Sequence, residues 1–81
     1  MATHELKIKP RHFADVAGGF KRAEIRKDDR RFRPGDVLHL REWRPILGYS
    51  GRSVAVGVTH ALTRADGLAP GYVVLSIERL P

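Results

Sequence analysis

The segment HELKIKPRHFADVAGG, from His4 to Gly19, carries a strand pattern followed directly by a helix pattern. Residues 4–8 alternate polar and apolar side chains with a period of two, which is typical of a half-buried strand. Beyond Pro10, which suits a first helical position, three apolar side chains recur at helical spacing: Phe13, Val16 and Ala17. Because Gly18-Gly19 supplies a stop, we expect a helix of about two turns that persists only when packed on a sheet.

Four further strands are expected downstream, at residues 23–27, 37–43, 53–60 and 72–77. In the first of these, Ala23 and Ile25 are predicted to face the core, with Glu24 and Arg26 on the opposite, polar face. Residues 28–36 and 44–51 contain proline or glycine and are predicted to be connections. The 81 residues make one domain, 1–81, of mostly β (α+β) class: a small barrel of about five strands with a short helix after the first.

The charge of the chain indicates its partners. Fifteen Lys and Arg residues against nine Asp and Glu give a net charge of +6, and the isoelectric point near 10.5 is in the range of nucleic-acid-binding domains. Seven of the cations lie between residues 21 and 33. A solvated basic surface is the alternative interpretation. The absence of cysteine excludes disulfides and thiolate metal sites, and a cytoplasmic location, in a bacterial host if the chain is phage-encoded, is expected.

The motif Gly19-x-Lys21-x-x-Glu24-x-Arg26 resembles the signature of the ASCH family, named for activating signal cointegrator homology. The resemblance extends over nearly the whole chain, which is similar to one small bacterial and bacteriophage branch of that family. The further blocks that carry it are His4-Glu5-Leu6-Lys7-Ile8, Asp29-Arg30 with Phe32, Gly35-Asp36, Tyr49-Ser50-Gly51-Arg52, Gly67-Leu68 and residues 71–77. The resemblance implies a PUA-like β-barrel.

For the site, the resemblance implies a cleft beside the motif that binds RNA or modified nucleosides through Lys21, Glu24 and Arg26. On a strand, Glu24 shares a face with Arg22 and Arg26, and two guanidiniums favour its ionised form. Glu24 is therefore expected to orient Arg26 or to accept a hydrogen bond from a base amino group, while Lys21 contacts phosphate. The alternative is an exposed salt bridge that contributes only about 0 to 1 kcal/mol.

Weaker candidates for ligand binding lie in or after the basic run: Arg30, Trp43, Tyr49 and Arg52. Aromatic rings among cations are what a single-stranded nucleic acid needs for base stacking. The alternative for Trp43 is a core anchor, since a lone tryptophan in a small domain is more often buried. The alternative for Tyr49 and Arg52 is that they form part of a simple turn.

The leading hypothesis is thus a non-catalytic module that binds RNA, single-stranded nucleic acid or a modified nucleoside. A second hypothesis is a hydrolase of the amidohydrolase or ribonuclease type, because some small relatives in the resembled family hydrolyse acylated cytosine nucleosides with a Lys, a Thr and a later carboxylate. Lys21, Glu24 and Glu78 are then the candidates for catalysis, with Glu24 standing where those relatives have Thr.

A third hypothesis is a phage-encoded module that binds a protein partner. No metal, cofactor or membrane segment is predicted, because the four histidines lack ligand spacing and the apolar runs are short.

Overall fold

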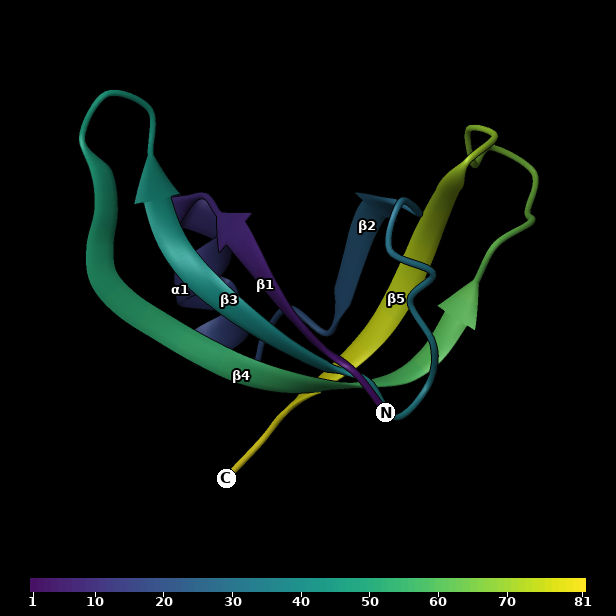
Figure 1. Cartoon of the computed structure of the whole chain (residues 1–81), viewed down its shortest axis with the longest axis horizontal. Helices are drawn as coiled ribbons and strands as arrows, with labels where there is room; N and C mark the ends of the chain where they lie inside the picture. The colour runs from purple at the N-terminus through teal and green to yellow at the C-terminus, as the bar shows by residue number, and fades with distance from the viewer.

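A computed structural model describes all residues, 1–81, and confirms a mostly β chain with one short helix after the first strand (Figure 1). The elements are β1 (Thr3–Ile8), α1 (Pro10–Ala17), β2 (Ala23–Lys27), β3 (Val37–Arg44), β4 (Gly48–Leu62) and β5 (Tyr72–Arg79). No helix combines the length and the apolar character needed to cross a membrane.

The five strands form one sheet in the order β1-β3-β4-β5-β2. β1 runs parallel to β3, and the other neighbouring pairs are antiparallel. The sheet curves into a half-barrel, and β4, with 15 residues, runs through the whole curve from one side to the other (Figure 1). β1 and β2 are therefore the two edges of the sheet, and they border its open side.

The core fills the concave side of this half-barrel. Leu38 and Leu40 on β3, Val56 on β4 and Leu75 on β5 have no more than 1% of their surface exposed. Helix α1 adds Phe13 and Val16, as its spacing predicted, so the helix is held by packing on the sheet. The helix begins with Pro10 in its first turn, and Gly19, at φ +80°, provides the predicted stop.

The predicted orientation of β2 is wrong. Glu24 is buried, with 6% of its surface exposed, whereas Ile25 is 64% exposed. Glu24 lies opposite Leu75 in the register, and cross-strand neighbours share a face, so the polar face of β2 turns toward the concave side. This inversion is tolerated because cations neutralise the Glu24 carboxylate there, as described below.

The predicted connection at residues 44–51 is also wrong. β3 continues to Arg44 and β4 already begins at Gly48, which is paired with Arg44, so only the turn at residues 45–47 joins them. The glycines that suggested a loop instead permit a tight hairpin, since Gly48 and Gly51 adopt φ +77° and +93°. The loop predicted at residues 28–36 is confirmed.

Candidate nucleic-acid site

The motif assembles around the carboxylate of Glu24. Lys21 Nζ donates hydrogen bonds to Glu24 Oε1 and to the carbonyl of Ala23, while Arg26 Nε donates to Glu24 Oε2 at 3.0 Å. Each carboxylate oxygen thus receives one cation, and both cations remain about a quarter exposed. The buried Glu24 carboxylate thus holds the Lys21 ammonium and the Arg26 guanidinium at the surface.

The prediction that Arg22 lies beside the Glu24 carboxylate is wrong. Arg22 is exposed, and its Nε donates to the carbonyl of Gly19 at 3.3 Å instead. Arg22 precedes β2 and turns back to the glycine stop of α1, whereas Lys21 reaches forward to the carboxylate. Alternation along an ideal strand could not predict this exchange, because β2 begins only at Ala23.

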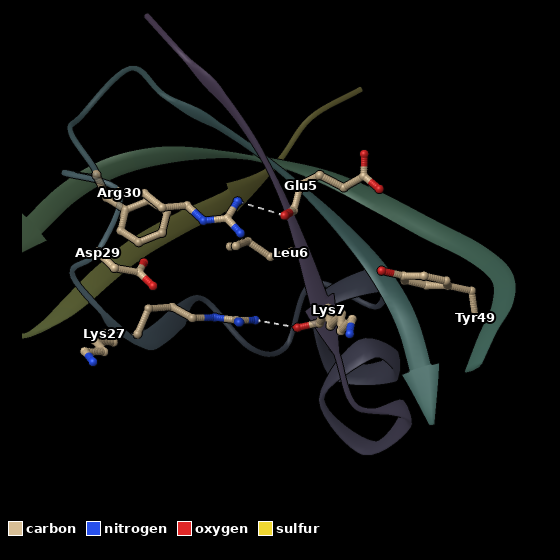
Figure 2. A pocket seen from close by; sticks show the side chains of 9 residues that line it. Glu5, Leu6, Lys7, Lys27, Asp29, Arg30 and Tyr49 are labelled. Carbon is tan, nitrogen blue, oxygen red and sulfur yellow. Dashed lines mark hydrogen bonds between the residues drawn. The ribbon is translucent and has the colours of Figure 1, made fainter. Parts of the chain in front are cut away.

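Arginine side chains bridge the open side of the half-barrel. Arg26 Nη2 donates to the carbonyl of Lys7 at 2.8 Å, and Arg30 Nη1 donates to the carbonyl of Glu5 at 2.9 Å (Figure 2). Both carbonyls belong to β1, on the edge that does not pair with β3. The two guanidiniums are therefore fixed in place between β1 and the segment that contains β2 and its following loop.

Two adjoining pockets lie along these two arginine side chains. One, of about 590 Å³, is lined by the motif together with Lys7, Lys9 and His12. The other, of about 480 Å³, is lined by Arg30 on one side of β1 and by Tyr49 on the other (Figure 2). Lys7 and Arg26, which are joined by a hydrogen bond, line both pockets, so the two pockets adjoin there, and we call the pair the seam groove. Each pocket is in the size range of small-molecule sites, roughly 300 to 1,000 Å³.

The seam groove is basic. Its cations are Lys7, Lys9, Lys21, Arg26, Lys27 and Arg30, and its carboxylates are Glu5, Glu24 and Asp29. Two of these carboxylates are already paired: Glu24 within the motif and Glu5 with Arg41 at 2.6 Å, a hydrogen bond that lowers the pKa of Glu5. The electrostatic potential of the cations that are left over is positive and favours an anionic ligand.

The structure separates the sequence-predicted residues into two groups. Lys21, Glu24, Arg26, Arg30 and Tyr49 all line the seam groove.

Trp43, Arg52 and Glu78 do not line the groove. Trp43 is half-buried outside the core, so the core-anchor interpretation is wrong, and the Lys7 ammonium lies 4.6 Å from the centre of its ring. The guanidinium of Arg52 lies over the ring of Phe13 at 4.8 Å. Glu78 is exposed on β5 and lines a third pocket, of about 420 Å³, which Lys21 also borders.

Sequence reasoning missed Lys7, Lys9 and His12 as groove residues. They come from the end of β1 and the start of α1, and β1 pairs with β3 rather than with the motif strand. No local pattern brings β1 opposite β2. Their approach to the motif depends on the curvature of the whole sheet, for which the sequence carried no signal.

Asp36 was also missed, and it organises the basic loop. Its carboxylate accepts hydrogen bonds from His4 Nε2 at 2.9 Å and from the backbone N–H groups of Ala2 and Arg33 at 3.0 and 3.1 Å. These bonds, that of His4 foremost, lower the Asp36 pKa to about 2. Asp36 thereby ties the segment that carries Arg30 to the start of β1.

Together, the half-barrel and the seam groove define a small β domain with a basic, ligand-sized depression along its open side. Residues 3–77 match the family described as a domain of unknown function, DUF3850, and the chain belongs to this family. It is also 41% identical over 73 residues to the "Uncharacterized 12.9 kDa protein in GpA 3'region" of Escherichia phage P2. The match covers 89% of this chain and 64% of that phage protein, so the chain spans less than two thirds of its relative's length.

Proposed function

We propose that this chain is a nucleic-acid-binding module whose seam groove holds a single-stranded RNA segment or a modified nucleotide. The observation that carries the proposal is the fixed position of Arg26, which is hydrogen-bonded to Glu24 and to the β1 backbone while lining both pockets. A guanidinium held in this way loses little freedom when it binds a phosphate, so more of the interaction energy remains for affinity.

The other groove residues supply complementary interactions. Lys21 and Lys9 place ammonium groups in the pocket beside the motif, where a phosphate would be neutralised. Glu24 has unused lone pairs on each oxygen and accepts a hydrogen bond from the amino group of a base. In the adjoining pocket the Tyr49 ring, 44% exposed, carries the Arg41 guanidinium 3.7 Å from its centre, and the other face of the ring provides a surface for a second base.

We also propose that the domain is related to the ASCH family, and the fold and the motif support this relationship. A curved five-stranded sheet with a helix after β1, carrying Gly19-x-Lys21-x-x-Glu24-x-Arg26 at its open side, is compatible with an ASCH domain of the PUA-like superfamily. A location in the cytosol agrees with nucleic acid as the ligand.

Fluorescence anisotropy with labelled single-stranded RNA and DNA oligomers tests the function. We expect the logarithm of the affinity to fall with the logarithm of the salt concentration by about 0.7 per phosphate contact. Lys21→Ala/Arg26→Ala should abolish this salt-dependent binding. Arg11→Ala/Arg64→Ala, which removes two exposed cations outside all three pockets, is the matched control and should retain it. Wild-type binding that ignores salt, or that survives in the double variant, contradicts the proposal.

A hydrolase of acylated nucleosides is a second candidate, favoured by one observation. Lys21 borders not only the seam groove but also the third pocket, which Thr59 and Glu78 line as well. These are the same residue types that act in the resembled amidohydrolases, although this threonine comes from β4. Release of acetate from acetylated cytidine, lost in Lys21→Ala and in Glu78→Gln, would favour this candidate; no release by the wild type would exclude that reaction.

A further inference from the structure

The hairpin between β3 and β4 projects beyond the five-stranded sheet. β1 accompanies β3 only as far as Glu42, and β5 accompanies β4 only from Val56 onward. Residues 43–52, which we call the arm, therefore form a two-stranded ribbon without a third strand at one end of the molecule (Figure 1). Neither the core nor the seam groove explains why the chain extends this far.

The tip of the arm is apolar, exposed and conformationally strained. Ile46 is fully exposed and Leu47 is 74% exposed. The N–H of Leu47 donates to the carbonyl of Pro45 at 2.8 Å, which closes a three-residue γ-turn with Ile46 at φ +73°. This turn is rare and strained, and a β-branched residue is poorly suited to its centre. Glycine would adopt this turn with less strain, so Ile46 does not stabilise the turn, and strain of this kind is often found at functional sites.

The charge of the arm identifies the kind of partner. Residues 43–52 contain two arginines and no acidic residue. Arg44 is exposed and forms no ion pair. Arg52 lies at the base of the arm, with its guanidinium 4.8 Å from the centre of the Phe13 ring and 3.9 Å from the Glu42 carboxylate, and its side chain is still 66% exposed. Two apolar side chains alone bury too little area for a stable protein interface, which needs roughly 1,200 Å² or more. An apolar wedge flanked by arginines matches a nucleic-acid duplex, whose base steps accept apolar side chains and whose grooves are bordered by phosphates.

We propose that the arm is a duplex-binding wedge: Ile46 and Leu47 insert between stacked base pairs while Arg44 and Arg52 contact the flanking phosphates. This site shares only the base of the hairpin, at Tyr49, with the seam groove and adds a second mode of binding to the proposed function. One molecule then contacts a single strand through the groove and a neighbouring duplex through the arm.

The experiment uses a duplex DNA of about 20 base pairs that carries 2-aminopurine in place of one adenine, whose fluorescence rises when its base step unstacks. We expect the wild type to raise the fluorescence. Ile46→Gly/Leu47→Ser should abolish the rise and weaken duplex binding by about tenfold, because the wedge is removed while the arginines remain. The same variant should fold at least as stably as the wild type, since glycine relieves the turn at position 46, and should bind single-stranded RNA as the wild type does.

Two controls separate this proposal from the function of the groove. Leu62→Ser removes a 39% exposed apolar side chain at the opposite end of β4 and should leave the fluorescence rise unchanged. Lys21→Ala/Arg26→Ala should lose single-stranded binding but keep the rise.

Three results would overturn the wedge. The first is no rise with the wild type. The second is an arm variant that loses single-stranded RNA binding to the same extent as duplex binding. The third is an arm variant that keeps duplex binding but loses self-association or binding to vesicles of anionic phospholipid.

Discussion

Two glutamates lie buried on the concave side of the sheet, in very different surroundings. Glu24 on β2 is 6% exposed, and each of its oxygens contacts a cation. Glu42 on β3 is 4% exposed, and its one charged partner is Arg52, 3.9 Å away with a largely exposed side chain. Both side chains are largely buried, yet only Glu24 has a cation hydrogen-bonded to each carboxylate oxygen, whereas Glu42 forms no side-chain hydrogen bond and is left with a longer contact and what water still reaches it.

The difference shows which buried charge belongs to a built site. A carboxylate that loses water without gaining close donors destabilises the fold, whereas one between two cations supports them. Lys21 and Arg26 come from the same short segment as Glu24, so the whole group is placed as soon as β2 is. Arg52 comes from the arm, where a long and exposed side chain contributes little to the pair. Three substitutions test this contrast.

Glu24→Ala should have the largest effect. It leaves Lys21 and Arg26 side by side without their anion, and the loss of one partner from a buried ion pair typically costs about 3 to 5 kcal/mol. Because both cations can still reach water, we expect a decrease of about 3 kcal/mol in the free energy of unfolding, measured by urea denaturation. A decrease below about 1 kcal/mol would mean that the motif is an ordinary surface ion pair.

Asp36→Asn should have an intermediate effect. Asp36 is buried like the two glutamates but is held by His4 and backbone N–H groups, so its hydrogen bonds to a charged group contribute about 1.5 to 3 kcal/mol. We expect the free energy of unfolding to fall by about 2 kcal/mol at pH 7.

The pH dependence gives a second measurement on Asp36. The folded protein binds this proton at a pKa of about 2 and the unfolded chain near 3.8, so the unfolded chain binds more protons between these values. The contribution of Asp36 is thus complete above pH 3.8 and is lost as the pH falls toward 2. Acid titration of stability should show a smaller loss in Asp36→Asn than in the wild type; equal losses would assign the acid sensitivity to other carboxylates.

Glu42→Leu should have the smallest effect. Replacing a poorly paired buried carboxylate by an apolar side chain of similar size is often neutral or stabilising. We expect the free energy of unfolding to stay within about 1 kcal/mol of the wild type or to rise. A loss of more than about 2 kcal/mol would show that Arg52 and Glu42 form a supporting pair after all, and would remove the contrast with Glu24.

Most of the fold was predictable because the strand and helix patterns are local. The alternation at residues 4–8, the helix before Gly18 and the apolar run at residues 72–77 each correspond to an observed element. What failed depends on the environment of a segment. In β2 the apolar Ile25 was assigned to the core, but alternation alone does not say which face is inside, and the buried face is the one whose charge is neutralised.

The site was predictable where its residues share a segment. Lys21, Glu24 and Arg26 were expected together and lie together. Lys7, Lys9 and His12 could not be foreseen, because they reach the motif through the curvature of the whole sheet. Residues 44–51 of the arm were predicted as a connection, since proline and glycine mark hairpin turns as well as irregular connections.

The position of β2 at the edge of the sheet fixes when the motif can form. Its only strand neighbour is β5, with Ala23 opposite Ser76 and Lys27 opposite Tyr72. During synthesis, the segment carrying Glu24 and Arg26 therefore waits unpaired until β5 has left the ribosome, since non-local pairing follows the local contacts. A nascent chain that ends before Tyr72 would contain every residue of the motif and yet have no assembled site.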